Sequence, residues 1–401
     1  MAKAANTKKA NKKVPQKSKT PKNKKISEPT IYKGLAGVTV DTTSVSKVMP
    51  ETNSLTYRGY AVQELAADCK FEEVAYLMWH GELPTRSQLR KFEQDERNRR
   101  NISRAHVDVI RQYPKRAHPM DTLRTSVSYL GTTETAWGGE PAAKDLDRAM
   151  NMLAKIPTMI ATDYRFRMGL ARKAPRKDLS MSENFFYMCF GTVPSKQVIR
   201  AFDISLILYA EHSFNASTFT ARVITSSRSD IYSAITGGIG SLKGPLHGGA
   251  NEAVMQNLLE IRTPERAEKW LRDKQANKEL VMGFGHRVYK HGDSRVPTMR
   301  AALEDLANWK GDQKWLEISD VLQDIMINEK GIHPNLDFPA GPAYYLMGFD
   351  IDMYTPIFVM SRITGWAAHV LEQNGSNSLI RPLSAYGGVK QRKVKPISKR
   401  K

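Results

Sequence analysis

The sequence predicts a mostly α-helical protein that carries a minor β element near its N-terminus. Along most of the chain, apolar residues recur at intervals of three and four, which is the period of one face of a helix. The alternating pattern of a strand is confined to Val38–Val40, Ser44–Val48 and Leu55–Tyr57, where Pro50 and Asn53 interrupt it. Strand and helix patterns do not alternate at the spacing of βαβ units and no internal repeat is visible, so a doubly wound sheet is not expected.

Helical periodicity is clearest in five segments of the chain. In residues 196–211 it follows a candidate N-cap, Ser195, and one face of the predicted helix holds Val198, Ile199, Phe202, Leu206 and Tyr209. In residues 356–372 a separate stripe beside the apolar face holds Arg362, Trp366 and His369. The other three predicted helices are 71–80, 251–261 and 317–328.

The length and the cysteine content of the chain limit its class. At 401 residues the chain is too long for one hydrophobic core, so we expect two domains. Uncharged stretches reach only about a dozen residues, whereas a membrane-spanning helix needs about 20, which argues against a transmembrane protein. Cys69 and Cys189 are too few for a disulfide framework or a cysteine-rich zinc site, and no apolar segment follows Met1. The sequence therefore predicts a cytoplasmic protein rather than a secreted one.

The net charge of +20 is concentrated in the two ends of the chain. Residues 1–28 hold ten lysines and one acid, residues 389–401 hold seven lysines or arginines and no acid, and residues 29–388 keep a net charge of only +4. Burial cannot offset the entropy of ordering ends so poor in apolar residues, so we expect disordered basic tails. Polyanion binding is a weaker alternative, since no aromatic residues interleave the lysines. A mitochondrial transit peptide is not expected, because the first 28 residues contain no arginine.

Glycine- and proline-rich segments, where helices are expected to stop, hold the residues most suited to chemistry. His247 precedes an amphipathic run, so its ring should lie near a helix N-terminus, whose dipole keeps the imidazole neutral and able to donate a hydrogen bond. His286 lies in a glycine-hinged loop rich in cations. Asp337 has apolar neighbours that should desolvate its carboxylate and raise its basicity. The segments concerned are 131–142, 237–250, 283–297 and 331–342.

Other readings of these segments are weaker. A metal site is the natural rival, but no H-x3-H or HExxH pair places two ligands on one helix face, and neighbouring arginines would repel a cation. A phosphate loop at 237–240 is not supported, since no strand precedes it and no GK[ST] follows. Structural or surface positions are expected for His80, His106, His118, His333 and His369. The surplus arginines favour an anionic substrate, because guanidinium suits carboxylates and phosphates; they are Arg287, Arg295, Arg362 and Arg381.

The segment 283–295, which reads GFGHRVYKHGDSR, closely resembles the signature of the citrate synthase family. The resemblance covers about residues 31–388 and leaves only the tails outside. Its other motifs are Gly34–Val38, Tyr57–Tyr60, His118–Asp121, Tyr209–Thr218, Pro245–Asn251 and Arg381–Pro382. Within the family, three features are more similar to 2-methylcitrate synthases than to ordinary citrate synthases. They are the segments Asn335–Pro339 and Tyr354–Trp366, and Ser294.

This resemblance implies an all-α homodimer with two domains in each subunit. The large helical domain would comprise residues 29–248 and 349–388, and the small one residues 249–348. The implied reaction is the condensation of an acyl-CoA with oxaloacetate, followed by hydrolysis of the thioester. Propionyl-CoA would be preferred, with 2-methylcitrate as product and a role in propionate breakdown, and citrate synthase activity with acetyl-CoA is the alternative. The acyl-CoA is then a substrate, and neither a cofactor nor a metal is expected.

The resemblance also implies roles for individual residues. Asp337 would remove the α-proton while His247 bonds the thioester oxygen, and His286 would polarise the carbonyl of oxaloacetate. These separate roles suit the deprotonation of a carbon acid, which needs a desolvated base and a preorganised hydrogen-bond donor. The carboxylates of oxaloacetate would be held by His212, Arg295, Arg362 and Arg381 of the partner subunit. The phosphates of CoA would be faced by Arg287 and Lys290.

Overall fold

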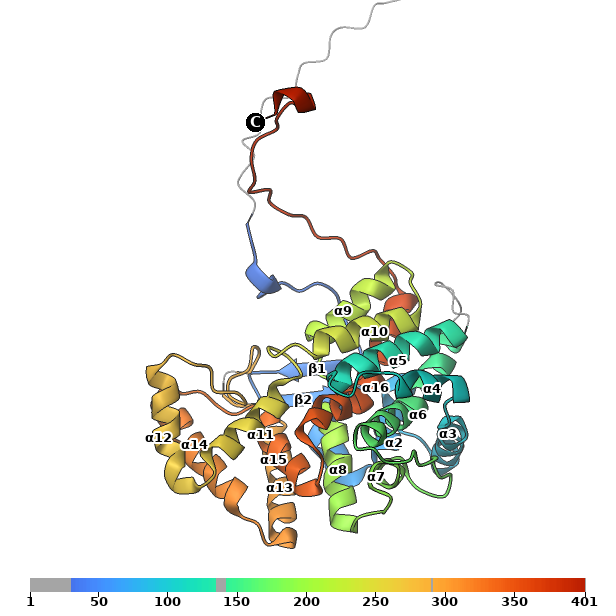
Figure 1. The fold of residues 1–401 in the computed structure, drawn as a ribbon, viewed down its shortest axis with the longest axis vertical. Coiled ribbons are helices and arrows are strands. Elements are labelled where there is room, and N and C mark those ends of the chain that lie inside the picture. The colour runs from blue at the N-terminus through green and yellow to red at the C-terminus, as the bar shows by residue number, and fades with distance from the viewer. Residues whose placement is uncertain (1–29, 135–141, 290, 401) are drawn as a thin grey trace, which may run out of the picture. The chain divides into compact units, whose positions relative to one another are not determined.

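The computed structural model describes residues 30–134, 142–289 and 291–400 (Figure 1). The described chain forms two units, a helical body from Thr42 to Ile380 and a second unit that joins 30–41 with 381–400. Mostly helical structure with a small sheet near the N-terminus is what the sequence predicts. The strands are β1 (Ser46–Met49), β2 (Ser54–Tyr57) and β3 (Tyr60–Ala61).

The helices of the body, in chain order, are α1 (Val62–Asp68), α2 (Phe71–His80), α3 (Arg86–Arg99), α4 (Arg104–Arg111), α5 (Pro119–Thr133), α6 (Ala142–Arg167), α7 (Met181–Phe190), α8 (Lys196–Tyr209), α9 (Ala216–Ser226), α10 (Ile231–Leu242), α11 (Ala250–Ile261), α12 (Pro264–Ala276), α13 (Val296–Lys310), α14 (Lys314–Lys330), α15 (Asp337–Met347) and α16 (Tyr354–Gly375). A 3₁₀ turn, η2 (Ile351–Met353), leads into α16. None of the described helices is both long and apolar enough to cross a membrane.

Local sequence explains where many helices begin and end. The side chains of Ser195 and Asn215 accept backbone N–H groups of α8 and α9, which is the bond expected of an N-cap. Thr85 and Ser180 form capping boxes with the third residue of α3 and α7. Several helices end at a glycine in the left-handed conformation, which needs a residue without a Cβ; these are Gly81, Gly191, Gly311, Gly331 and Gly348.

The sheet lacks the first of the strands that the sequence predicts. Its order is β1-β2-β3, antiparallel throughout, with Val48 opposite Leu55. The predicted strand at Val38–Val40 is wrong, because these residues have no regular structure, pair with no strand and are exposed. Alternation alone does not make a strand when no neighbouring strand supplies hydrogen bonds.

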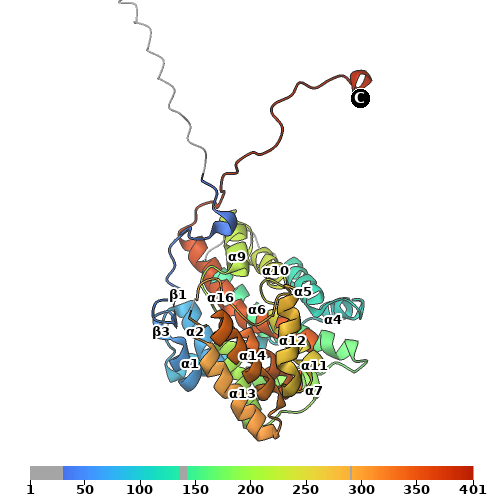
Figure 2. The same ribbon diagram turned by 90° about the vertical axis from the view of Figure 1, so that its left-hand side faces the viewer.

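Helix α16 forms the centre of the body (Figure 1). Every residue from Tyr354 to Val370 is buried, so the helix is enclosed on all sides, and it packs against α6, α8, α9 and α10. Helices α11 to α15 lie together on one side of it (Figure 1), and α12, α13 and α14 face the viewer in Figure 2. The predicted division into a large and a small domain, with 249–348 as the small one, stays a prediction.

Two glycine-rich segments do not stop helices as predicted. Helix α10 continues through Gly237 and Gly238, where a Cβ at Gly238 would lie 3.2 Å from the ring of Trp366. Helix α15 likewise contains Gly341 and Pro342. These residues let helices approach each other closely, so that tertiary packing outweighs their low helix propensity.

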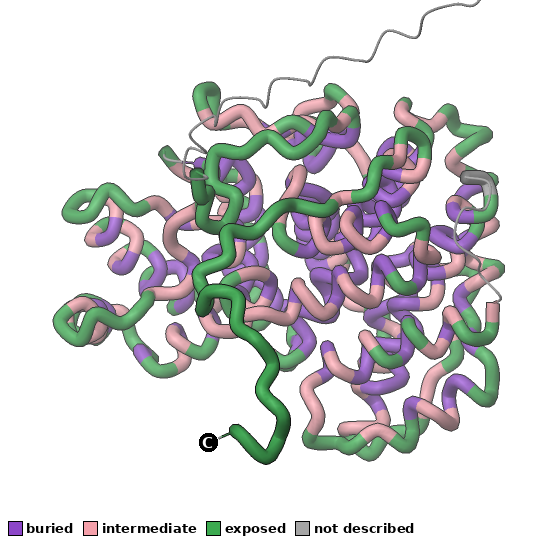
Figure 3. The backbone as a smooth tube through the Cα atoms, turned by 90° about the horizontal axis from the view of Figure 1, so that it is seen from above, coloured by how far each residue is buried: buried purple, intermediate pink, exposed green. Residues whose placement is uncertain are grey.

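The second unit consists of chain without a core. All described residues of 30–41 and 381–400 are exposed, and their regular structure is limited to the 3₁₀ turns η1 (Lys33–Leu35) and η3 (Ile397–Lys399) (Figure 3). The predicted C-terminal tail, 389–401, belongs to this unit, whereas the predicted N-terminal tail, 1–28, lies outside the described residues.

Candidate active site

The C-terminal end of α8 is the platform on which the site is built. Tyr209 is the last residue of the helix, and the chain stays buried through His212. The Tyr209 hydroxyl donates to Oδ1 of Asp337 at 2.6 Å, and the Tyr209 carbonyl accepts from Nε of Arg362 at 2.7 Å. One residue of α8 thus links a carboxylate from the first turn of α15 to a cation in the middle of α16.

Asp337 is partly accessible, but protein atoms surround its carboxylate. This burial raises the pKa of Asp337 to about 6, against the opposing effects of the Tyr209 hydrogen bond and of the Arg295 charge. The apolar neighbours in the sequence predict the same direction. A carboxylate with this pKa is ionised at neutral pH and more basic than an ordinary aspartate.

His247 lies in the turn before α11. Its Nε2 accepts the backbone N–H of Ser217 at 3.2 Å and lies 2.8 Å from the Ser217 hydroxyl. Because a nitrogen that accepts an N–H carries no proton, the neutral ring is protonated on Nδ1 and can donate from there. Burial, followed by the charge of Arg362, lowers the pKa of His247 to about 3. The ring is neutral as predicted, but burial rather than the helix dipole is the main cause.

His286 has the opposite tautomer for the same kind of reason. Its Nδ1 accepts the backbone N–H groups of Val288 and Tyr289 at 3.0 and 3.1 Å, so the neutral ring carries its proton on Nε2. Burial and the charge of Arg295 lower the pKa of His286 to about 4. The ring of His212 lies 5.0 Å away, centroid to centroid. His247 and His286 are therefore neutral imidazoles, each able to donate one hydrogen bond.

Cationic and polar groups converge beside these rings. The guanidinium of Arg295 is paired with Asp293 through Nε–Oδ1 and Nη2–Oδ2 contacts of 2.9 and 2.6 Å. Within the described residues, Nη1 of Arg362 and Nε2 of His212 are buried without a hydrogen-bond partner. Unpartnered buried groups are costly, so these two atoms mark where an anionic ligand would be bound.

The structure does not bring every predicted site residue to this centre. Arg287 is exposed in the loop after His286. Arg381 is exposed in the second unit, which is described apart from the body. Lys290 lies outside the described residues.

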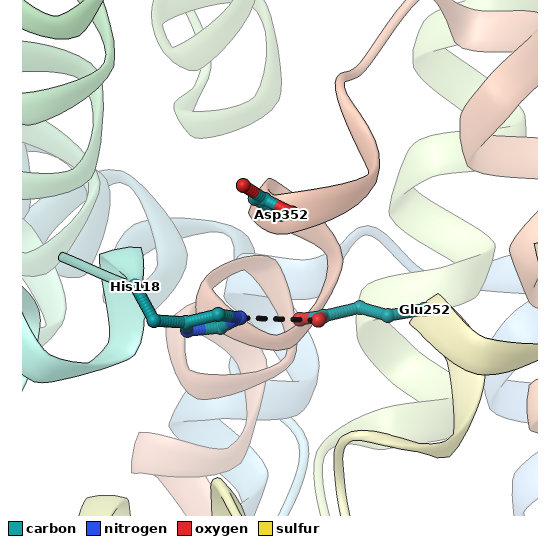
Figure 4. A group of neighbouring side chains, drawn as sticks. All are labelled: His118, Glu252 and Asp352. Carbon is teal, nitrogen blue, oxygen red and sulfur yellow. Dashed lines mark hydrogen bonds and ion pairs between the residues drawn. The ribbon is translucent and has the colours of Figure 1, made fainter. Parts of the chain in front are cut away.

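A second grouping of histidine and carboxylates lies at the starts of α5, α11 and α16 (Figure 4). His118, Glu252 and Asp352 have possible ligand atoms within 4.8 Å of one another. His118 uses both ring nitrogens, since Nδ1 accepts the backbone N–H of Met120 and Nε2 lies 3.1 Å from Glu252. No ring nitrogen is left for a metal ion, so the grouping fits a structural link between helices, the role that the sequence predicts for His118.

Sequence reasoning missed residues that support the site. Tyr209 is predicted only as part of the apolar face of a helix, and Ser217 has no predicted role. Ser217 also accepts from Nε1 of Trp366 at 3.1 Å and donates to Asn215 at 2.8 Å, so it fixes the position of His247. The signal that could have found both is their place in the motif Tyr209–Thr218.

Chemically, the centre combines a desolvated carboxylate with two neutral N–H donors, the incompletely paired guanidinium of Arg362 and the buried His212 ring, whose pKa burial holds well below its usual value. The carboxylate can accept a proton from carbon, and each donor can stabilise an oxygen on which negative charge develops. The guanidinium of Arg362 and the neutral ring of His212 can hold the carboxylates of a substrate. Proton abstraction next to a carbonyl is the reaction class that needs this set.

Known proteins resemble the chain over nearly its whole described length. The family model named "Citrate synthase, C-terminal domain" matches residues 34–383. A 2-methylcitrate synthase of Mycobacterium tuberculosis is 59% identical over 364 residues, which cover 91% of this chain and 92% of that protein. A citrate synthase of Mycolicibacterium smegmatis is 58% identical over 366 residues, 91% and 97% of the two chains. A solved ternary complex of Thermoplasma acidophilum citrate synthase with carboxymethyl coenzyme A and oxaloacetate has a TM-score of 0.88 at 36% identity, covering 92% of this chain and 100% of that one.

Proposed function

This chain belongs to the citrate synthase family, and from that premise we propose that its site condenses an acyl-CoA with oxaloacetate and then hydrolyses the thioester. The observation that carries the proposal is the raised pKa of Asp337 together with two imidazoles that are neutral and of opposite tautomer. Asp337 and His247 both feel the charge of Arg362, and Asp337 and His286 both feel that of Arg295. An enolate-forming reaction needs a base and a donor of this kind, both in place before charge develops.

In the proposed condensation, Asp337 removes a proton from the α-carbon of the acyl-CoA. The Nδ1–H of His247 donates to the thioester oxygen, which becomes the enolate oxygen. The α-carbon then attacks the keto carbon of oxaloacetate, and the Nε2–H of His286 stabilises the oxygen that becomes an alkoxide. The product thioester is hydrolysed by water, which releases CoA.

Binding of oxaloacetate is assigned to two arginines and to the neutral ring of His212. The unpartnered atoms of Arg362 and His212 support this assignment, and Arg295 lies beside His286 as a further candidate. We propose that Arg287 and Lys290 face the phosphates of CoA. Acyl-CoA is a substrate in this scheme and side chains carry both the proton transfer and the charge, so we propose that no cofactor or metal is needed and that excess chelator leaves the rate unchanged.

A homodimer is proposed as the active unit, with Arg381 of the partner subunit completing each site. Exposed apolar side chains in the second unit support an interface there, because this unit has no core of its own to bury them and burial against a partner would be favourable. They are Ile31, Tyr32, Leu35, Leu383 and Tyr386, the last two 91% and 79% exposed. Mixed Arg381→Ala and His286→Ala chains should regain part of the activity that each homodimer lacks. Absence of rescue despite subunit exchange would contradict a shared site.

We propose propionyl-CoA as the preferred acyl donor, 2-methylcitrate as the product and breakdown of propionate in the cytoplasm as the setting. The similarity around Asn335–Pro339 and the 2-methylcitrate synthase of M. tuberculosis at 59% identity support this choice. The M. smegmatis citrate synthase at 58% identity favours acetyl-CoA as the second candidate. The two unpaired cysteines, Cys69 and Cys189, suit a reducing compartment.

The test is a thiol-release assay with saturating oxaloacetate and each acyl-CoA in turn. One methylene in an apolar pocket is worth about 1–3 kcal/mol, so propionyl-CoA should lead by roughly 10–200-fold in kcat/KM. A lead of about tenfold or more for acetyl-CoA would identify a citrate synthase instead. No thiol release from either substrate would overturn the condensation itself.

A further inference from the structure

The Tyr209–Asp337 hydrogen bond is a contact to the reacting carboxylate that the proposed mechanism does not use. We infer that Tyr209 is a positioning residue for the Asp337 base: its hydroxyl fixes one carboxylate oxygen and leaves the other to take the proton. This inference rests on the proposed function, in which Asp337 is the base. It concerns how the base is held, not which substrate it acts on.

The hydroxyl of Tyr209 is the donor in this contact. Burial raises the pKa of Tyr209 well above 10, so the phenol keeps its proton, while an ionised carboxylate can only accept. The O–O distance of 2.6 Å lies in the range of charge-assisted hydrogen bonds. Within the described residues, this is the one hydrogen bond that the Asp337 carboxylate makes. Oδ2 therefore has no fixed partner and is the oxygen available to a substrate.

Tyr209 is itself held firmly, as a positioning group must be. Its side chain is 1% exposed, and its ring packs against Phe358 of α16 at a centroid distance of 4.2 Å. It also stacks with Tyr344 of α15 at a centroid distance of 6.5 Å. The carbonyl of the same residue accepts from Arg362. The hydroxyl thus has its direction set by three elements, α8, α15 and α16.

The charges around Asp337 indicate what loss of the hydroxyl would do. The groups that face the carboxylate are Tyr209 from α8, Asp293 and Arg295 from the segment just before α13, and Arg362 from α16. The hydrogen bond from Tyr209 and the two arginines favour the charged form, whereas burial and Asp293 oppose it. Removing only the hydroxyl leaves both arginines in place, so the pKa of Asp337 should rise without loss of the site's charge.

The variant Tyr209→Phe removes the hydroxyl and keeps the ring. Its kcat should fall by about tenfold or more, since a small misplacement of a catalytic group is costly. The acid limb of its kcat profile should move up by about one pH unit, because a donor to the charged form has been lost. The KM for oxaloacetate should stay within about twofold, because the groups that bind it are untouched.

The matched control is Tyr344→Phe. Tyr344 is also fully buried and lies in the same aromatic layer, but its hydroxyl donates to Ser205 at 3.1 Å and not to Asp337. This variant loses one buried hydrogen bond, so it should lower stability while its acid limb stays at the wild-type position. The positioning role is refuted if the acid limb of the kcat profile does not shift in Tyr209→Phe, or if it shifts by the same amount in Tyr344→Phe.

A second measurement does not depend on turnover. The carboxyl ¹³C resonance of Asp337, assigned by its loss in Asp337→Asn, can be titrated in wild type and in Tyr209→Phe. We expect a higher midpoint in the variant, and an equal midpoint would overturn the inference. A wild-type protein without thiol release would instead refute the proposed function, so the two failures are distinguishable.

Discussion

Two sites in this protein contain histidine and carboxylate side chains, but the pKa values of their histidines are shifted in opposite directions. At the junction of α5 and α11, His118 bonds directly to Glu252, and this contact raises the pKa of His118. At the end of α8, no imidazole bonds to Asp337: both His247 and His286 accept backbone N–H groups and have lowered pKa values. The carboxylate there receives its hydrogen bond from a tyrosine instead.

The difference shows what separates a reactive site from a structural link. When an imidazole and a carboxylate pair with each other, each stabilises the charged form of the other. At His118 the second ring nitrogen is also occupied, by the backbone N–H of Met120, so no ring nitrogen is left to act on a substrate. When burial and backbone amides keep them apart, the imidazoles stay neutral donors and the carboxylate becomes a stronger base. Proximity of residue types is therefore a weaker guide to chemistry than the hydrogen bonds that each group already makes.

The largest loss of activity is expected when the carboxylate of Asp337, but not that of Glu252, is exchanged for an amide. Asp337→Asn should lower kcat by about 10²–10⁴-fold, because an amide of the same shape cannot take the proton. Glu252→Gln is the matched control and should stay within about fivefold of wild type. Steady-state thiol release, with circular dichroism to confirm folding, measures both. Near-normal turnover of folded Asp337→Asn would remove this residue from the role of base.

A smaller loss is expected when the donors are removed. His247→Ala and His286→Ala should each lower kcat by about 10²–10³-fold, the usual effect of deleting one donor to a developing oxyanion. His118→Gln should change kcat little, because His118 faces another carboxylate. The comparison is wrong if His118→Gln is as damaging as the other two in the same assay.

The smallest effect concerns stability at the structural link. The pKa of His118 is raised in the folded protein, so its bond to Glu252 stabilises the fold below the unfolded pKa of about 6.5 and ceases to do so as pH rises through the folded value. His118→Gln should therefore cost about 1 kcal/mol more at about pH 5.5 than at about pH 8.5. Urea unfolding at the two pH values measures this, and a cost that grows with pH would contradict the assigned link.

Much of the fold follows from local sequence, and the exceptions have a common cause. The predicted helix at 71–80 coincides with α2, and the capping signal of Ser195 marks the start of α8. The helical course through Gly238 could not be predicted, because the ring packed against this glycine is that of Trp366, more than a hundred residues further along the chain. Val38–Val40 failed as a strand for lack of a partner, which is also a non-local property.

The candidate site divides in the same way. Glycine-flanked motifs and apolar neighbours single out His247, His286 and Asp337, since loops that present reactive groups carry local signals. The role of Tyr209 could not be predicted from the α8 pattern, because its hydroxyl acquires a function only when α15 packs beside it. The tautomers of the two imidazoles could not be predicted from the sequence either, because they are set by backbone amides of folded loops.

The central claim is that burial makes Asp337 a base while the imidazoles beside it stay neutral, and the pH profile of kcat/KM tests it most directly. The base must be ionised to act, so activity should fall as pH decreases through about 6, the pKa of Asp337. The pKa values of His247 and His286, about 3 and 4, place their protonation below that range. The expected result is a fall of kcat/KM with an apparent pKa near 6, caused by protonation of Asp337. A limb near 4, where an ordinary aspartate titrates, would contradict the account.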